Sequence, residues 1–301
     1  MSSLDIATAF IRRNLESQQR KPLVVGIQGP QGSGKSYLAS HLAQELSKEP
    51  SPLRVVVLSI DDLYLPHQGL VAVAKANPDN PLLKGRGQPG THEIQLGVNL
   101  LHALYEGDAE VKLPSFDKSL FNGEGDRLPM DDTRVVKPPV VDVVILEGWF
   151  VGFQPISSDD LDMKWEQTWG KERALLGIPE GLCKKENVAQ LNHNLNDYQR
   201  LWDLLTIFIQ LKPSAPESTS ESLFSIVYEW RLEQEHYMKA HNGNKGMSDE
   251  GVKQFVHRYI PGYVFFLATL DSSPKWKGKK LTLTLDKNRK TFFEITSAHM
   301  G

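Results

Sequence analysis

Length, composition and charge place the sequence among ordinary globular proteins. The chain has 301 residues, of which 40% are hydrophobic and 24% are charged. This usage excludes the disordered, collagenous and coiled-coil classes. The 34 basic and 37 acidic residues give a formal net charge of −3, which is too balanced for a general polyanion binder, so we expect no nucleic-acid partner.

Cysteine content and the length of the apolar runs indicate in which cellular compartment the protein works. The single cysteine, Cys183, excludes an internal disulfide framework and suits a reducing compartment, so we expect the cytoplasm, with the nucleus as the other compartment that would fit. The longest apolar run, 260–270, contains a Pro-Gly pair and is about half the length of a bilayer span, so we expect no membrane partner. Asp5 and Glu16 argue against a transit peptide and favour a first helix that caps the fold.

The apolar pattern predicts a parallel sheet covered by helices. Residues 23–28 form a short apolar run that predicts a strand buried on both faces, and a glycine loop follows it. Leu38, Leu42 and Leu46 then recur at the spacing of one helix face. The same strand pattern returns at four places, namely 54–60, 140–146, 204–211 and 263–270. Strands that alternate with helices predict a three-layer α/β/α fold with a mostly parallel central sheet.

The remaining segments complete a single predicted domain over residues 1–301, with its core in 22–270. Thr91 is predicted to cap a helix that begins near Ile94, and a second long helix is predicted over 217–240. Long loops at 77–90 and 114–139 are rich in glycine, proline and charge, which is typical of functional loops. We interpret the polar segment 157–200 as an insertion and the tail 275–297 as a C-terminal β-hairpin appended to the last strand.

A phosphate-binding motif lies between the first strand and its helix. The sequence GPQGSGKS fits G-x-x-x-x-G-K-[ST] at every fixed position, in the strand-to-helix context that the motif requires. Backbone amides and the positive helix end would converge there on a phosphate. Lys35 would reach the β- and γ-phosphates, and the Ser36 hydroxyl would bind Mg²⁺. The predicted contacts to the nucleotide are Gly29, Pro30, Gln31, Gly32, Ser33, Gly34, Lys35 and Ser36.

Carboxylates that follow two other predicted strands indicate which chemistry uses the phosphates. Asp61 and Asp62 follow the second strand, and Glu147 ends the strand that starts at residue 140, so all three should lie at the sheet edge that carries the phosphate loop. An Asp at this edge can accept the proton of an alcohol that attacks the γ-phosphorus, and Glu147 can hold magnesium. The alternatives are turn initiation for the Asp pair and a helix cap or ion pair for Glu147. The run 244–247 lacks the aspartate of a guanine-binding element, so a GTP switch is disfavoured.

Six motifs in one order carry a resemblance to a known family. The strand followed by GPQGSGKS, then SIDDLYL, KGRGQPGTHE, LPSFDKSLFNGEGDR, VVILEGWFVGF and VYEWRLEQE, resemble the glycerate kinase family and its fungal ATP-dependent kinase relatives, over roughly residues 23–264. More distantly, the sequence is similar to uridine kinase, phosphoribulokinase and pantothenate kinase. The resemblance implies a P-loop kinase fold and ATP as the phosphate donor.

The same resemblance implies roles for individual residues. It makes Asp61 the catalytic base, assisted by Lys35 and Arg127, and it adds Tyr37 to the ATP contacts. Arg231 is the candidate for a lid that neutralises transferred charge, with a simple helix-surface arginine as the equal alternative. His92 can equally be a residue at the start of a helix. The implied acceptor pocket consists of Asp62, Tyr64, Lys84, Arg86, Thr91, His92, Phe116, Asp117, Lys118 and Asp126.

These features together predict an ATP:alcohol phosphotransferase. The two loops over the catalytic edge carry four cations, Lys84, Arg86, Lys118 and Arg127. Such cations favour a small anionic acceptor, unless they are solvated or pair with other charges of the loops. D-glycerate is the first candidate that the resemblance implies, and ATP and Mg²⁺ are the expected cofactors. The alternatives are a kinase of pantothenate or a nucleoside, or a nucleotide-binding regulatory protein without transfer activity. We expect a monomer whose partner is its small-molecule acceptor.

Overall fold

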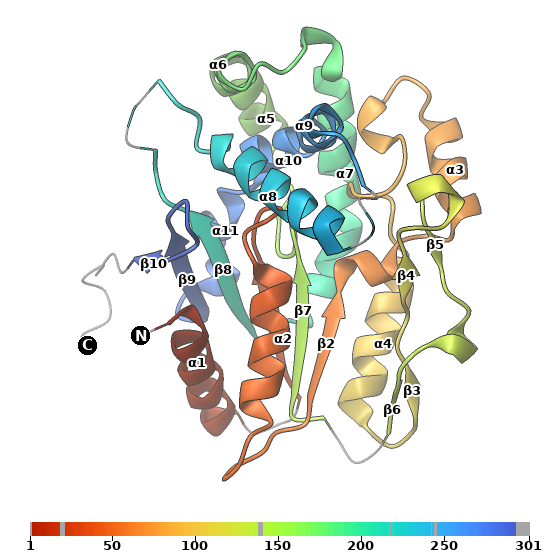
Figure 1. Ribbon diagram of the computed structural model, residues 1–301, viewed down its shortest axis with the longest axis vertical. Helices are drawn as coiled ribbons and strands as arrows, with labels where there is room; N and C mark the ends of the chain where they lie inside the picture. The colour runs from red at the N-terminus through yellow and green to blue at the C-terminus, as the bar shows by residue number, and fades with distance from the viewer. Residues whose placement is uncertain are drawn as a thin grey trace.

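A six-stranded sheet runs through the middle of the molecule, and five of its strands are parallel (Figure 1). The computed structural model describes residues 2–18, 22–137, 141–216, 218, 220–241, 243 and 246–292. In spatial order the strands are β10 (Thr291–Phe292), β9 (Lys280–Leu285), β8 (Ile207–Pro213), β1 (Leu23–Gln28), β7 (Val143–Gly148) and β2 (Val55–Ser59). Only β10 runs antiparallel to its neighbour. The predicted α/β/α class with a mostly parallel sheet is confirmed.

Helices cover both faces of this sheet. Because successive side chains of a strand point to opposite faces, Val25 and Ile27 of β1 pack with α1 and α2, and Val24 packs in the core on the other face. Every residue of β1 and β7 is therefore buried, whereas the edge strand β2 alternates between buried and half-buried residues. The helices that contribute to the two cores include α1 (Ser3–Ser17), α2 (Lys35–Leu46), α4 (Ile94–Glu106), α7 (Lys185–Trp202) and α10 (Ile260–Phe266).

The register of the three central strands assembles the catalytic edge. Glu147, near the carboxyl end of β7, lies opposite Ile27 of β1 on one side and Ser59 of β2 on the other. The chain leaves β1 into the phosphate loop immediately after Gln28, and it leaves β2 into a short 3-10 turn, Ile60–Leu63. The phosphate loop and the Asp61 turn are therefore adjacent to Glu147 on either side.

The predicted strand at 263–270 is wrong, because this segment is helical. It lies in α10 and in α11 (Thr269–Ser272), and every residue of α10 is buried. A short helix that is apolar on all sides has no periodicity to distinguish it from a buried strand. The fifth parallel strand is β9, which was predicted as the first arm of the C-terminal hairpin. β9 does form an antiparallel pair with β10, and residues 293–297 of the predicted hairpin lie outside the described residues.

Other boundaries also differ from the prediction, among them that of the strand expected over 204–211, which is β8 (Ile207–Pro213). Thr91 is not a helix cap: Glu93 occupies that position before α4, and the Thr91 hydroxyl donates instead to the carbonyl of Gln88 within its own loop, at 2.7 Å. The helix expected over 217–240 is α8 (Ser225–His241), since a polar stretch around Pro216 precedes it and Glu217 itself lies outside the described residues. The strand expected over 140–146 begins at Val143, and Val140 is likewise not described.

The segment 157–200 is mostly helical and contributes to the core. It contains α5 (Ser158–Lys164), a π-helical turn (Trp165–Trp169), α6 (Gly170–Leu175), a 3-10 turn (Glu180–Leu182) and most of α7. Leu191, Leu195 and Trp202 of α7 are fully buried in the same core cluster as α4. The polar composition of this segment therefore describes the outer faces of helices that close one side of the sheet.

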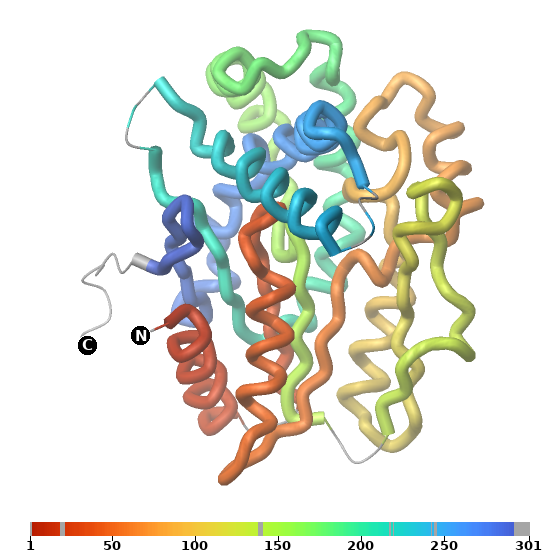
Figure 2. The backbone as a smooth tube through the Cα atoms, viewed as in Figure 1, coloured from red at the N-terminus to blue at the C-terminus, as the bar shows by residue number. Residues whose placement is uncertain are grey.

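The long loops form short elements around the catalytic edge. The stretch around 60–137 contains α3 (His67–Ala76), 3-10 turns at Pro81–Leu83, Phe121–Gly123 and Met130–Asp132, and the two strand pairs β3 (Val111–Lys112) with β6 (Val135–Val136) and β4 (Phe116–Asp117) with β5 (Asp126–Arg127). Helices α8 and α9 (Asp249–His257) lie over the end of the sheet where α2 begins (Figure 2), and a last 3-10 turn, Pro274–Trp276, leads into β9. Within the part of the chain that the structure describes, no helix is long and apolar enough to cross a bilayer.

Candidate active site

The phosphate loop has the backbone conformation that its glycines permit. Gly34, which precedes α2, is left-handed with φ of 89°, and Gly32 is left-handed with φ of 73°. A Cβ atom on Gly32 would lie 2.5 Å from the backbone carbonyl of Trp230 in α8, so only glycine fits between the loop and this helix. The amides at the start of α2 are consequently free to face an anion, which is the arrangement that binds phosphate.

Two side chains that sequence reasoning missed hold the loop from outside. The backbone N–H of Gln31 donates to the hydroxyl of Tyr263 in α10 at 3.2 Å. The guanidinium of Arg289, in the turn between β9 and β10, donates to the carbonyl of Gly32 at 2.7 Å and lies over the Trp230 ring at 5.5 Å. Neither has a sequence signal of its own, because Tyr263 lay in a predicted strand and Arg289 in a basic tail.

Lys35, Ser36 and Glu147 meet the requirements of a magnesium and phosphate site. The ammonium of Lys35 makes no hydrogen bond or ion pair with any described residue. Ser36 donates its hydroxyl to Oε1 of Glu147 at 2.9 Å. Glu147 is only 5% exposed, and its Oε2 has no partner among the described residues. A buried carboxylate oxygen beside a hydroxyl fits Mg²⁺, which typically takes one or two protein oxygens together with phosphates and water.

Asp61 lies in the 3-10 turn after β2, where Ser59 caps the turn. Its Oδ1 accepts a hydrogen bond from the Tyr64 hydroxyl at 2.9 Å, and its Oδ2 forms an ion pair with Lys118. Burial alone would raise the pKa of Asp61, but the charge and hydrogen bond of Lys118, with the charge of Lys35, hold this pKa at about 2. Asp61 is therefore an ionised carboxylate that faces the phosphate-loop lysine.

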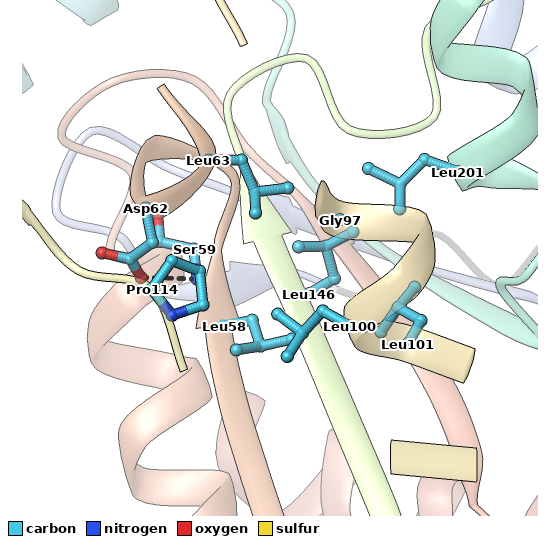
Figure 3. Close-up of a pocket in the computed structure, with 10 residues that line it drawn as sticks. All are labelled: Leu58, Ser59, Asp62, Leu63, Gly97, Leu100, Leu101, Pro114, Leu146 and Leu201. Carbon is cyan, nitrogen blue, oxygen red and sulfur yellow. Dashed lines mark hydrogen bonds between the residues drawn. The ribbon is translucent and has the colours of Figure 1, made fainter. Parts of the chain in front are cut away.

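The Asp62 side chain caps the 3-10 turn that carries Asp61. Its carboxylate accepts a hydrogen bond from the Ser59 backbone N–H at 3.2 Å, which completes a capping box (Figure 3). Figure 3 shows it beside Pro114, in the lining of a small cavity that also includes Ser59, Gly97 and leucines of β2, β7, α4, α7 and the 3-10 turn. Turn initiation, the alternative given for the Asp pair, thus describes the contacts of Asp62, whereas Asp61 remains available for chemistry.

The predicted acceptor loops come together around Asp61. Tyr64 is buried, its ring stacks on His92 at 4.4 Å and meets the edge of Phe116 at 5.1 Å. Burial lowers the pKa of His92 to about 3, so the ring is neutral, and its Nε2 has no partner among the described residues. Arg86 lies over Phe116 at 5.8 Å and donates to the carbonyl of Gly123 at 2.6 Å. The loops thus bring an aromatic cluster and two cations, Arg86 and Lys118, to the surroundings of Asp61.

Arg127 and Asp126 of β5 make contacts that position the loops. Arg127 donates to the Tyr64 carbonyl at 2.6 Å and forms an ion pair with Glu93 at 2.6 Å. Asp126 accepts from the backbone N–H groups of His67 and Arg127, both at 2.8 Å. These contacts fix the backbone that carries Tyr64, and the catalytic role of Arg127 stays a prediction.

Among the described residues, the other predicted ones make no hydrogen bond, ion pair or ring contact with Asp61, Lys35, Ser36 or Glu147. Arg231 is buried and pairs with Glu235 on the same helix at 2.7 Å, beneath the ring of Phe255. Lys84 is exposed, and its ammonium makes no hydrogen bond or ion pair with a described residue, and Asp117 accepts from Ser119 in its own turn. Tyr37 is 70% exposed and stacks on His41 at 3.8 Å, one residue beyond the phosphate loop. Thr91 is fully buried.

Tyr259 is a further residue at this site that the sequence pattern did not indicate. Burial raises its pKa, and the charge of Asp61 raises it further, whereas the charges of Arg258, Arg86 and Lys118 lower it. A Cβ on Gly87 would come within 2.2 Å of this hydroxyl, which explains the glycine of the KGRGQPG loop. The indole N–H of Trp149 donates to the Gly87 carbonyl at 3.0 Å and fixes the same loop.

The sheet order, the phosphate loop and the carboxylates beside it define a P-loop kinase. A kinase of Schizosaccharomyces pombe, described as uncharacterized, is 40% identical over 295 residues, covering 96% of this chain and 98% of that one. The chloroplastic D-glycerate 3-kinase of Arabidopsis thaliana is 33% identical over 253 residues, which cover 83% of this chain and 48% of the plant protein. The aligned part thus spans about half the length of that relative.

A solved structure extends this similarity to the fold. The D-glycerate 3-kinase from Cryptococcus neoformans var. grubii superposes with a TM-score of 0.86 at 37% identity, covering 97% of this chain and 98% of that chain. No family model matches the sequence. The chain belongs to the family of ATP-dependent small-molecule kinases that includes these D-glycerate 3-kinases. The resemblance seen in the sequence motifs is thereby confirmed.

Proposed function

We propose that the protein transfers the γ-phosphate of ATP to a hydroxyl of a small hydroxy acid, with D-glycerate as the first candidate. The observation that carries the proposal is the grouping of one ionised carboxylate, Asp61, with two cations, Lys118 and Arg86, beside the phosphate loop. A carboxylate there suits an alcohol as the acceptor, and the two cations suit an acceptor that carries a negative charge. The D-glycerate 3-kinases among its relatives support this choice of acceptor.

In this proposal the nucleotide lies on the phosphate loop, Gly29 to Ser36. The amides at the start of α2 and the ammonium of Lys35 bind the β- and γ-phosphates. Ser36 and Glu147 would hold Mg²⁺, which when bound neutralises charge on the β- and γ-phosphates. Tyr37, exposed and one residue beyond the loop, is the proposed further contact to the nucleotide.

The acceptor lies between the loops, with its reacting hydroxyl at Asp61. Asp61 takes the proton of this hydroxyl and aligns its oxygen with the γ-phosphorus, which is most of what phosphoryl transfer asks of a protein group. Arg127 holds Tyr64 and so orients the Tyr64 hydroxyl that bonds Asp61. The pocket is completed by Lys84, Arg86, Thr91, His92, Phe116, Asp117, Lys118 and Asp126, whereas Asp62 caps the turn that carries Asp61. Arg231 is the proposed lid group, on the helix whose Trp230 carbonyl already packs against Gly32.

A substrate panel tests the proposal directly. ADP release is measured with MgATP and D-glycerate, glycerol, pantothenate or uridine as the acceptor. We expect D-glycerate to stimulate ADP release well above the rate with water, and Arg86→Ala to raise KM mainly for anionic acceptors. If no acceptor stimulates ADP release while MgATP still raises the melting temperature, the protein binds nucleotide without transfer and the proposal fails. Preference for pantothenate or uridine would reassign the acceptor.

We also propose that the chain acts as a monomeric single domain in the cytoplasm. The single buried cysteine supports the choice of a reducing compartment. Size-exclusion chromatography with light scattering tests the oligomeric state, and a dimer mass would overturn that part of the proposal.

A further inference from the structure

Both oxygens of the proposed base are occupied by donors from the protein itself. Tyr64 donates to Oδ1 of Asp61, and the ammonium of Lys118 pairs with Oδ2. A hydroxyl that is to lose its proton must donate a hydrogen bond to this same carboxylate. The ion pair also makes the carboxylate a weaker base, because Lys118 is the main group that lowers its pKa.

Lys118 is held by Asp61 alone, whereas its cationic neighbour is fixed by the loop. Asp61 is the only partner of the Lys118 ammonium among the described residues, and the Lys118 side chain is 55% exposed. Arg86, in contrast, donates to the carbonyl of Gly123 and lies over the ring of Phe116. A lysine on a flexible four-carbon stem can exchange one carboxylate for another, and an anchored guanidinium cannot.

We propose that Lys118 is a gate on the base Asp61, and that the carboxylate of the acceptor opens it by taking the place of Asp61 at the lysine ammonium. The proposal rests on the proposed function, since it assigns a role within the same acceptor site. A free enzyme then holds a neutralised base, and only an acceptor that brings its own negative charge frees Oδ2 for the reacting hydroxyl. Arg86 and Lys118 face this anion from two loops.

The chemical step that follows is an ordinary phosphoryl transfer. The acceptor oxygen forms a bond to the γ-phosphorus while the bond between this phosphorus and the bridging oxygen of ADP breaks, and ADP leaves with the electron pair. The hydroxyl proton passes to the freed Oδ2 of Asp61 and later to solvent. No oxidant or further reactant is needed.

The gate gives the enzyme two properties that a simple substrate clamp would not give. Without an acceptor, the neutralised base activates water poorly, so ATP is spared from hydrolysis. A neutral polyol such as glycerol carries the same kind of hydroxyl as D-glycerate but no carboxylate, so it cannot displace Asp61 from Lys118. Discrimination against glycerol therefore arises from failure to free the base as well as from weaker binding.

The test is ATP hydrolysis by the Lys118→Met variant in the absence of any acceptor. We expect the rate to rise about tenfold, because a more basic Asp61 abstracts the proton of water more readily. Lys112→Met is the matched control, since Lys112 is an exposed lysine of the same stretch that pairs with Asp131, and its rate should equal that of the unmodified protein. The rise should vanish in the Asp61→Asn/Lys118→Met double variant. If Lys118 only binds the acceptor, Lys118→Met raises KM for D-glycerate and leaves acceptor-free hydrolysis unchanged, which overturns the gate.

The pH profile gives a second readout. Removal of the Lys118 charge should raise the pKa of Asp61. The acidic limb of the pH profile of kcat/KM should therefore move to higher pH in Lys118→Met, by about one to two pH units. An unmoved limb contradicts the gate. The other groups that face Asp61 stay the same in both proteins, namely Tyr64, Lys35, His92, Tyr259 and Asp62. If the unmodified protein phosphorylates no acceptor, the proposed function fails, whereas acceptor-free hydrolysis still decides the gate.

Discussion

The nucleotide side and the acceptor side of the active site are built from different parts of the chain. On the nucleotide side, contiguous backbone from Gly29 to Ser36 forms the phosphate loop, and side chains of Tyr263 and Arg289 bond to it. On the acceptor side, the groups around Asp61 are side chains far apart in sequence, such as Lys118, which pairs with it, and His92 and Tyr259, whose pKa values its charge raises. A backbone site is specified by a local motif, and a side-chain site depends on how the loops pack.

The largest expected effect falls where the two sides meet, at Asp61. Asp61→Asn removes the proposed base but keeps the shape of the side chain, so we expect kcat to fall by about 10² to 10⁴. KM for ATP should change little, because the phosphate loop is untouched. Asp62→Asn is the control: it weakens the capping box of the turn and should lower the melting temperature more than it lowers kcat. Equal losses of kcat in the two variants would contradict the division of roles.

A second substitution, Gly32→Ala, tests the nucleotide side alone. Gly32→Ala places a Cβ 2.5 Å from the Trp230 carbonyl at a residue whose φ is 73°. Such strain is of order 1–3 kcal/mol, so we expect KM for ATP to rise about tenfold or more. Gly170→Ala is the matched control, because a Cβ there meets no atom within 4 Å, and it should leave KM unchanged. A Gly32→Ala variant with normal KM would show that the fit against α8 is not needed for nucleotide binding.

Substitution of Arg289, which bonds the phosphate loop from the turn between β9 and β10, should have a smaller effect. Arg289→Met removes the hydrogen bond to the Gly32 carbonyl and the ion pair with Glu233. We expect KM for ATP to rise about threefold to tenfold, since one charged hydrogen bond is lost at a partly exposed position. Lys287→Met, two residues earlier in the same turn, should not change KM. A melting temperature that falls while KM stays constant would make Arg289 a stabilising residue only.

The smallest expected effect is the contribution of His92, on the acceptor side, to the pH dependence of the protein's stability. His92 has a pKa of about 3 in the folded protein, against 6.5 in its ordinary state. The unfolded chain therefore takes up the proton first as the pH falls below about 6.5, and stability is lost progressively from there toward pH 3. Thermal melts should show a steeper loss between about pH 7 and pH 5 in the unmodified protein than in His92→Gln. Parallel curves would mean that His92 is not held neutral by burial.

Most of the layered fold was predictable from the sequence because it follows local periodicity. Apolar runs predicted four of the five parallel strands, and the GPQGSGKS motif predicted the phosphate loop with its helix. The failure at 263–270 has a physical reason: a short segment that is buried on every side shows no polar face, so strand and helix leave the same pattern. The missing strand, β9, was recognisable from its alternating leucines but not from its place in the sheet.

The sequence by itself determined the class of chemistry, because a contiguous phosphate loop and a carboxylate after β2 carry their geometry with them. Only the tertiary structure decided which side chains contact one another around Asp61. Lys118 pairs with Asp61, Asp62 caps its own turn, and Arg127 bonds the Tyr64 carbonyl. The structure also brought Tyr259 near Asp61 and Arg289 onto the phosphate loop. These contacts join residues that are far apart along the chain or that differ only in the direction of a side chain. No local pattern records either property, since both arise when the loops pack over the finished sheet.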